Sequence, residues 1–383
     1  MKRNINRWLF AVLSILQFTA FAQPRGPFTN SPQVHEDKTV TFEYLAPNAQ
    51  KVLLSGQFLK GGPVEMKKGE QGIWRTTVGP IAPDMYPYNF EVDGVGVMDP
   101  GNVNYFPNER FKGSILLVPG NQPRMYEMKN VPHGSVNYEY YPSLENSTGS
   151  LVVYTPPGYD ASPDKSFPVF YLISGTTDTE ETFYKVGNVN WILDNLIAEG
   201  LAEPMIVVMP YGNVAARIAE QNGKPKPEDP ARESEASNAR MKQLENDLIK
   251  NIIPYIESNY RAIKKRESRA IGGFSRGGGQ TLRAAYGNMD TFGSICCYSA
   301  SASPKDMDND FSYIGKNPEQ TNAQLKLNWV SVGNSDFMYP STVEYMNYLY
   351  AHNIKYQGLI TSGGHTWMNV KKFMVESLQL LFK

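Results

Sequence analysis

The sequence is poor in residues that bind metals or cross-link a chain. It contains two cysteines and four histidines in 383 residues, and Cys296 and Cys297 are adjacent. Neighbouring Cα atoms lie about 3.8 Å apart, closer than disulfides usually tolerate. We therefore expect two buried free thiols in the apolar run 292–298. So few cysteines and histidines argue against a structural zinc site, and no motif predicts any other metal or cofactor.

A strong charge of either sign is also missing. The net charge is −1 and the pI about 6.5, which gives no indication of nucleic acid or an anionic membrane surface as a partner. No internal repeat is visible. Beyond residue 22 no apolar run is long enough to cross a bilayer, so we expect no membrane anchor. The sequence does not indicate an oligomeric state.

Residues 1–22 have the pattern of a secretory signal. A basic start is followed by the largely apolar run 8–21 and by the small-x-small site Ala20-Phe21-Ala22. A permanent amphipathic anchor is the alternative, but the apolar run is too short to span and no cysteine follows the site to accept a lipid. We expect the protein to be exported, to the periplasm or beyond the cell.

The first part of the mature chain predicts a small all-β domain. Residues 23–37 form an extended lead-in, and 38–117 contain short alternating strands separated by turn residues, which is typical of an immunoglobulin-like β-sandwich. Residues 118–135 read as a linker. The strands are expected at Thr39–Leu45, Lys51–Phe58, Gly72–Val78 and Tyr86–Asp93.

From residue 136 to 383 the pattern changes to that of an α/β domain. Near-continuous apolar strands separated by helices predict a mostly parallel sheet covered on both faces. The polar segment 215–236 is either a solvated loop or a flap over the site. After a hairpin formed by Val136–Tyr141 and Gly149–Thr155, the strands are expected at Val169–Ile173, Met205–Met209, Ala270–Gly272, Gly293–Tyr298, Leu327–Val332 and Lys355–Ile360, with long helices at Ser237–Asn259 and Ser341–His352.

One motif organises this domain. Gly273-Phe274-Ser275-Arg276-Gly277 lies between an apolar strand and a helix expected over Gln280–Tyr286, the setting of a nucleophile elbow. Small residues on either side of the serine let strand and helix pass closely, and the helix N-terminus faces the negative charge that develops on a substrate. The motif predicts Ser275 as a catalytic nucleophile; the alternative is a glycine-rich turn with an incidental serine.

A serine nucleophile needs a base, and a carboxylate that orients the base. His365 follows the last apolar strand, where open α/β sheets place their chemistry, and we predict it as the base. Asp336 follows the strand 327–332 and is the predicted acid, although it is also an ordinary turn residue. The fallback acids are Asp306, Asp308 and Asp310. The order Ser275, Asp336, His365 is that of α/β-hydrolases.

The oxyanion of the reaction needs two N–H donors. The backbone N–H of Arg276 follows the nucleophile, and Gly175 lets the backbone approach closely, so we assign the second donor to the Thr176 N–H. The Arg276 side chain either contacts substrate or points to solvent. Trp367, beside the predicted base, either stacks on a phenolic acyl group or belongs to the core.

These motifs together resemble the esterase D/feruloyl esterase group of carbohydrate esterases over about residues 130–383. The resemblance rests on Tyr171-Leu172-Ile173-Ser174-Gly175, Gly273-Phe274-Ser275-Arg276-Gly277-Gly278, Gly333-Asn334-Ser335-Asp336 and Gly363-Gly364-His365-Thr366-Trp367. The preceding domain is similar to early-set, glycogen-binding-like modules. The resemblance implies an α/β-hydrolase that removes feruloyl or acetyl groups from plant polysaccharides such as arabinoxylan.

This sequence departs from that group at two positions. Ser174 stands where many relatives have histidine, and Arg276 stands where Met or Ala is common. Two other functions remain open: another exported serine esterase, such as a siderophore esterase, or a glycan-binding protein on an inactive hydrolase scaffold. For the last, Trp74, Tyr86 and Tyr88 are either a sugar-binding platform or, as their alternation favours, core residues.

Overall fold

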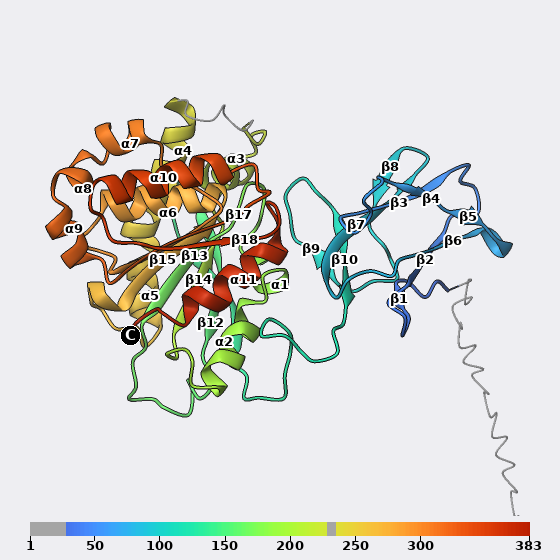
Figure 1. The fold of residues 1–383 in the computed structure, drawn as a ribbon, viewed down its shortest axis with the longest axis horizontal. Coiled ribbons are helices and arrows are strands. Elements are labelled where there is room, and N and C mark those ends of the chain that lie inside the picture. Colours follow the sequence, from blue (N-terminus) through green and yellow to red (C-terminus); the bar gives the residue numbers. More distant parts are fainter. Residues whose placement is uncertain (1–27, 228–234) are drawn as a thin grey trace, which may run out of the picture.

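The computed structural model describes residues 28–227 and 235–383. A small β-domain and a larger α/β domain lie side by side (Figure 1). The expected secretory signal, residues 1–22, lies outside the described residues. Within the described ranges, no helix is both long enough and apolar enough to cross a membrane.

The β-domain consists of two antiparallel sheets packed as a sandwich. The first sheet has the order β1-β2-β6-β5, and the second β4-β3-β7-β10-β9 with β8 paired to β7. The expected sandwich is confirmed, although the short strands β1, β4, β5, β8 and β9, and also β10, had not been predicted. The strands are β1 Gln33–Val34, β2 Val40–Leu45, β3 Val52–Gly56, β4 Val64–Glu65, β5 Lys67–Lys68, β6 Ile73–Val78, β7 Asp84–Val92, β8 Val95–Val97, β9 Tyr105–Phe106 and β10 Gly113–Val118; a 3₁₀ turn covers Glu70–Gly72.

Aromatic side chains fill this sandwich. Phe42 packs edge-on against Tyr88 and Phe90, with ring centroids 5.0 and 6.4 Å apart. Trp74 is 5% exposed and donates its indole N–H to Ala46 O at 2.9 Å. Tyr88 is likewise buried, and Tyr86 is half-buried. Of the two roles considered for these aromatics, Trp74 and Tyr88 have that of core residues, because their rings are not available to a sugar.

The α/β domain is built on one eight-stranded sheet with the order β11-β12-β14-β13-β15-β16-β17-β18. Strand β12 runs antiparallel to its neighbours, and the pairs from β14 to β18 are parallel. Most of the inner strands are continuous buried apolar runs, as expected for a sheet covered on both faces. The strands are β11 Ser135–Pro142, β12 Thr148–Thr155, β13 Val169–Ile173, β14 Ile206–Pro210, β15 Arg269–Phe274, β16 Ser294–Tyr298, β17 Leu327–Gly333 and β18 Gln357–Thr361.

Helices cover both faces of this sheet (Figure 1). Helices α2 and α11 pack together on one face, and α4, α6 and α10 lie over the other. The helices are α1 Thr182–Lys185, α2 Val189–Ala198, α3 Val214–Gln221, α4 Glu235–Asp247, α5 Ile253–Asn259, α6 Arg276–Gly287, α7 Pro304–Asn309, α8 Ser312–Lys316, α9 Pro318–Gln324, α10 Tyr339–Ala351 and α11 Trp367–Leu378, with 3₁₀ turns at Leu144–Asn146 and Arg266–Ser268.

Two helices differ from the sequence prediction. The single helix expected over 237–259 is divided into α4 and α5 by a π-helical turn, Leu248–Ile252. Helix α6 begins at Arg276, directly after the predicted nucleophile, rather than at Gln280. The second difference matters for function, because it places the helix N-terminus against Ser275.

The junction between the domains is apolar with a buried ionic cluster at its edge. The hydrophobic core around α2 and α11 continues into the β-domain through Met85, Phe106 and Ile115. Lys371 of α11 is 1% exposed and lies 3.4 Å from Asp84 of β7. Arg124 of the linker lies 3.5 Å from the same carboxylate. Burial lowers the pKa of Lys371 to about 8, against the attraction of Asp84.

Candidate active site

The topology brings two strand-end loops together. Strands β13 and β15 are neighbours, with Ile173 paired to Gly273; the chain leaves β13 toward β14 on one side and leaves β15 toward β16 on the other. Loops that leave adjacent strands at such a switch point diverge and open a crevice at the carboxyl edge of the sheet. The loop that begins at Ser174 and the turn at Ser275 therefore flank one crevice.

The turn at Ser275 has the strained geometry of a nucleophile elbow. Ser275 has φ 56° and ψ −120°, a region that non-glycine residues rarely adopt. A Cβ on Gly277 would lie 2.1 Å from Ile173 O, and one on Gly273 would lie 2.4 Å from Gly277 O. Both flanking glycines are therefore required for the close approach of α6 to the sheet. The Ser275 N–H is held by Tyr298 O at 3.0 Å.

A histidine and a carboxylate meet beside this elbow. His365 Nδ1 lies 2.9 Å from both carboxylate oxygens of Asp336. Asp336 is 4% exposed and also accepts the Met338 N–H at 2.8 Å. Burial raises the pKa of Asp336, but the hydrogen bonds from His365 and Met338 outweigh it and hold the pKa below its usual range. An ionised Asp336 fixes the tautomer with hydrogen on Nδ1, which leaves Nε2 as an acceptor.

Two phenylalanines hold the imidazole in place. The rings of Phe274 and Phe337 lie 4.6 and 4.3 Å from that of His365, centroid to centroid. Because Phe274 directly precedes Ser275, the histidine is adjacent to the elbow. Within the part of the chain that the structure describes, no hydrogen bond joins Ser275 Oγ to the imidazole. In unliganded enzymes this contact is often long and tightens when substrate binds.

The crevice widens into a cavity of about 580 Å³. Ser275, Thr176 and Arg276 line it, so the predicted nucleophile and both predicted oxyanion donors face the same space. Its walls are mixed, with apolar and hydrogen-bonding side chains, a composition suited to an acyl group and a polar alcohol. The remaining lining residues include Asn213, Val214, Ser237, Asn238, Arg240, Met241, Gln280, Ser301, Ser303, Phe337, Met338, Ser341 and Glu344.

Arg276 has a local structural contact as well as a place in the cavity wall. Its guanidinium donates to Gly175 O at 3.3 Å, so the side chain links the elbow to the loop after β13. As the first residue of α6 it also contributes one of the backbone N–H groups that have no acceptor within the helix. Whether it contacts substrate stays a prediction.

Of the two roles considered for Trp367, the structure favours the core, and contact with substrate stays a prediction. Trp367 is 6% exposed, and it packs edge-on against Phe183 and Phe274 at 4.8 and 5.3 Å. Trp367 is the first residue of α11 and contacts the elbow through Phe274, and it does not line the cavity. Trp367 is close to His365 in the sequence, but Thr366 caps the N-terminus of α11, and the first side chain of this helix is directed into the core.

The fallback acids have other partners. Asp306 lines the cavity and completes the capping box of α7, accepting the Ser303 N–H at 3.3 Å and the Ser303 hydroxyl at 2.7 Å. Asp308 accepts the Tyr348 hydroxyl, and Asp310 lies 3.5 Å from Arg283. None of the three is bonded to His365. The structure thus brings Asp336 to the predicted base; the catalytic roles of both residues stay predictions.

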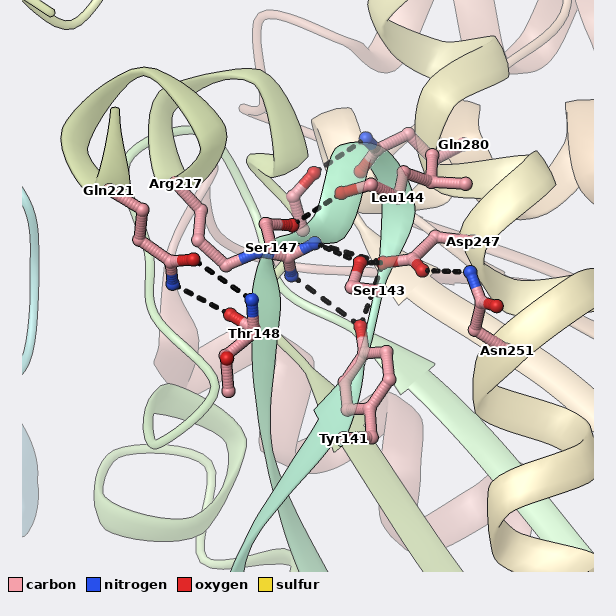
Figure 2. Close-up of polar contacts among 11 residues, drawn as sticks. Tyr141, Ser143, Leu144, Ser147, Thr148, Arg217, Gln221, Asp247, Asn251 and Gln280 are labelled. Carbon is pink, nitrogen blue, oxygen red and sulfur yellow. Dashed lines mark hydrogen bonds and ion pairs between the residues drawn. The ribbon is translucent and has the colours of Figure 1, made fainter. Parts of the chain in front are cut away.

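A buried ion pair fixes one wall of the cavity (Figure 2). Arg217 of α3 lies 3.0 Å from Asp247 of α4, and both side chains are almost completely buried. The hydroxyls of Ser143 and Tyr141 donate to the same carboxylate at 2.7 and 2.8 Å. This cluster anchors α3, whose first residue, Val214, lines the cavity.

The polar insertion 215–236 is not one solvated loop. It begins within α3 and its last residues belong to α4, while 228–234 lie outside the described residues. The cavity is lined at the start of the insertion by Val214 and Ala215, and beyond its end by Ser237, Asn238, Arg240 and Met241. Its assignment as a flap stays a prediction. Sequence reasoning also missed Asn213 and Phe337, which carry no motif of their own.

In a comparison with known proteins, family models match each of the two domains. A family model described as an esterase matches residues 143–369. A model for carbohydrate-binding module 48, the isoamylase N-terminal domain, matches residues 28–108. An endo-1,4-beta-xylanase/feruloyl esterase of Xylanibacter ruminicola is 28% identical over 93% of this chain, and endo-1,4-beta-xylanase Y of Acetivibrio thermocellus is 30% identical over 48%. The chain spans 46% of the first relative and 16% of the second.

Solved structures agree on the fold. A feruloyl esterase module from Clostridium thermocellum, complexed with sinapinate, is 23% identical with a TM-score of 0.53; the alignment covers 73% of this chain and 94% of that one. The enterobactin esterase from Shigella flexneri is 14% identical with a TM-score of 0.63, and its alignment covers 92% and 96% of the two chains. At these identities the likeness establishes an α/β-hydrolase fold and, for the second, the two-domain arrangement.

Proposed function

The chain belongs to the Esterase family, and from this premise we propose that it is an exported serine esterase that hydrolyses feruloyl or acetyl esters on plant arabinoxylan. Ser275 is the nucleophile, His365 the base, and Asp336 the carboxylate that orients the base. The backbone N–H groups of Arg276 and Thr176 bind the oxyanion.

The reaction proceeds through an acyl-enzyme. Ser275 Oγ attacks the ester carbonyl while His365 Nε2 takes its proton, and the negative charge on the carbonyl oxygen is bound by the two backbone donors. The carbon–oxygen bond to the sugar then breaks, and the alcohol leaves with the proton from His365. Water repeats the sequence on the acyl-enzyme, releasing the acid and the free serine. No cofactor takes part in these steps.

One observation carries the proposal. The Asp336–His365 pair lies against Phe274, the residue directly before a serine with φ 56° that opens onto a cavity. A buried carboxylate that orients an imidazole beside a strained serine is the constellation that activates a hydroxyl. A glycine-rich turn with an incidental serine would need neither the strain nor the oriented histidine.

The proposed substrate follows from the cavity and from the relatives. A cavity of about 580 Å³ is within the range that accommodates an aromatic acid and part of a sugar. The Xylanibacter ruminicola relative is named for both xylanase and feruloyl esterase activity. Feruloyl groups on arabinoxylan are therefore the first choice of substrate, and acetyl groups the second.

A second candidate is a siderophore esterase. The enterobactin esterase aligns over both domains of this chain, whereas the feruloyl esterase module aligns over 73%. The likeness at 14% identity is one of fold, so the choice between the two substrates depends on turnover.

The test combines an active-site probe with a substrate panel. A fluorophosphonate should label the wild type and fail to label Ser275→Ala. Methyl ferulate, feruloylated arabinoxylan oligosaccharides, acetylated xylan and a catecholate siderophore should then be compared by kcat/KM. Failure to label the wild type would remove the esterase proposal, and the glycan-binding alternative would replace it. A siderophore turned over fastest would favour the second candidate.

Export has a separate test. We expect the secretory signal at residues 1–22 to be removed, so that mass spectrometry of the protein from its native host or a secreting host begins at Gln23. A protein that retains Met1 and stays inside the cell would contradict the proposal.

A further inference from the structure

One segment of the β-domain reaches the loop that carries the proposed Thr176 donor. Residues 107–109 follow β9, and Figure 1 shows β9 on the side of the β-domain that faces α1. Asn108 and Asp178 form an isolated antiparallel bridge between the domains. The Glu109 N–H donates to Thr177 O at 2.7 Å, and the Thr182 hydroxyl donates to Pro107 O at 2.9 Å.

These contacts surround a strained residue. Thr177 has φ 62°, a left-handed conformation that a β-branched residue adopts only when its surroundings impose it. Its carbonyl is held by Glu109, and the next side chain, Asp178, accepts the Asn108 amide at 3.0 Å. The domain contacts therefore act on the two residues that directly follow Thr176.

Asn108 is itself fixed. Its amide oxygen accepts the N–H groups of Arg110 and Phe111 at 3.0 and 2.9 Å, which leaves the amide nitrogen directed at Asp178. Both side chains are buried, at 6% and 5% exposure. An amide held in this way can transmit the position of the β-domain to the catalytic loop.

Asp178 lies against the backbone of that loop. A Cβ on Gly175 would lie 3.1 Å from Asp178 Oδ2, so the carboxyl group packs directly beside the residue that precedes Thr176. Burial raises the pKa of Asp178 to about 7, opposed by hydrogen bonds from Asn108 and the Gly175 backbone and by Arg276. Removing the Asn108 donor would leave a buried polar group with one partner fewer, and this favours rearrangement of the loop.

The same segment, residues 107–109, also contacts the loop after β14. The Glu109 carboxylate accepts the Tyr211 hydroxyl at 2.5 Å and the Asn213 amide at 3.2 Å. Tyr211 and Asn213 follow β14, and Asn213 lines the cavity. Residues 107–109 thus connect the loops after β13 and β14.

We propose that Asn108 and Asp178 are positioning residues, through which the β-domain holds the Thr176 N–H where it can bind the oxyanion. The inference rests on the proposed function and extends it: the β-domain contributes to the chemical step on every substrate, including small esters that make no use of a carbohydrate-binding surface.

The test uses methyl ferulate, which carries no sugar. Asn108→Ala and Asp178→Ala should each lower kcat by ~10-fold or more with KM changed by less than ~2-fold, a smaller loss than the ~100-fold of deleting a donor. The double variant should lose no more than the larger single loss, because the two residues act as one contact. Asp178→Asn keeps an acceptor for Asn108 and should stay within ~5-fold of wild type.

Asn102→Ala is the matched control. Asn102 donates its amide to Ile115 O at 2.8 Å and to Tyr88 Oη at 3.0 Å, inside the β-domain. The Asn102→Ala substitution removes a side-chain amide, as Asn108→Ala does, but it removes no contact with the catalytic loop. The kcat of this variant should therefore remain at the wild-type value at a temperature where the protein is folded. An equal loss of kcat in Asn102→Ala would overturn the inference, since the effect would then be one of domain stability.

The outcomes separate this inference from the proposed function. A wild type that neither turns over esters nor reacts with fluorophosphonate contradicts the proposed function. An active wild type with an unchanged kcat in Asn108→Ala, or additive losses in the double variant, overturns the positioning role alone. If Asn108→Ala does not fold, the contrast between Asp178→Ala and Asp178→Asn decides the question in its place.

Discussion

The α/β domain places its candidate chemistry in loops that follow β13, β15, β17 and β18, whereas the β-domain buries most of the side chains that first suggested a role for it. Ser275, Asp336 and His365 lie at strand ends, where backbone geometry is free to serve a site. Trp74 and Tyr88 fill a core. In the α/β domain the candidate functional residues can be predicted from their residue types and motifs. In the β-domain the role of an aromatic residue depends on whether its position is buried.

This difference between the domains indicates that a role of the β-domain should be sought at its contacts with the α/β domain and not in its buried aromatic residues. The β-domain contacts the loops beside the site through backbone groups of residues 107–109, the Asn108 amide and the Glu109 carboxylate, and none of these groups is aromatic. A domain that resembles a carbohydrate-binding module can therefore contact the loops of a neighbouring candidate site. Substitutions in the two domains should therefore separate activity from stability.

Ser275→Ala should have the largest effect and should leave the fold intact. Removing a serine nucleophile costs on the order of 10⁴-fold or more in kcat, and we expect this loss with methyl ferulate. The alanine keeps the buried backbone contacts of the elbow, so the thermal midpoint should shift by less than ~3 °C. A residual rate within ~100-fold of wild type would show that another residue is the nucleophile.

Asp336→Asn should lower kcat by ~10³–10⁴-fold at neutral pH, because an amide no longer fixes the His365 tautomer. Its effect on stability depends on pH. The pKa of Asp336 is lowered on folding, so its carboxylate stabilises the native state above the unfolded pKa of about 3.9 and that contribution is lost as pH falls through the lower, folded value.

Urea denaturation at pH 7 and pH 3.5 measures the contribution of the Asp336 carboxylate to the free energy of unfolding. Wild type should lose more unfolding free energy between the two values than Asp336→Asn does. Equal losses would mean that the carboxylate is not held ionised by His365 and Met338.

Phe90→Ala, in contrast to Ser275→Ala and Asp336→Asn, should lower stability strongly and activity little. The ring is fully buried and packs against Phe42 and Tyr88, and deleting such a ring costs about 3–5 kcal/mol. We expect this loss in urea denaturation of the β-domain. At a temperature where the variant remains folded, kcat for methyl ferulate should stay within ~3-fold of wild type; a larger loss would indicate that the core of the sandwich is coupled to the site.

Lys371→Met tests the junction and has the smallest expected effect. The pKa of Lys371 is about 8 in the folded protein and 10.5 in a model peptide, so between these values the unfolded state binds more protons and unfolding free energy rises with pH. From pH 8 to pH 10 wild type should gain about 2 kcal/mol relative to Lys371→Met. Parallel pH profiles of the two proteins would contradict a buried lysine at the junction.

Much of the catalytic domain could be predicted because its signals are local. Gly273 and Gly277 mark the elbow since no larger residue fits there, and the strands have the apolar runs of a sheet buried on both faces. Asp336 and His365, which the structure brings into contact, are predicted from their order and their place after strands. Each of these inferences needs only the neighbouring residues and the rule that parallel strands end at one edge.

What escaped prediction depends on contacts between distant segments. Asn108 meets Asp178 only because two domains dock in one orientation, and an asparagine in a polar turn carries no sign of its partner. Trp367 is buried because of the direction in which α11 starts, which a pattern of residue types does not reveal. The π-helical turn at Leu248–Ile252 has a local signal instead: Pro254, the second residue of α5, has no N–H to donate to the preceding turn.

The edge of the catalytic sheet sets a practical limit on how this protein can be shortened. Strand β11 pairs with β12 along its whole length, from Ser135 with Thr155 to Pro142 with Thr148, and its Glu139 accepts the hydroxyls of Tyr255 and Tyr260. A recombinant fragment that starts after Pro142 would leave the buried strand β12 as a bare edge, open to pairing with other chains. Cloning boundaries for an isolated esterase domain therefore belong upstream of Ser135.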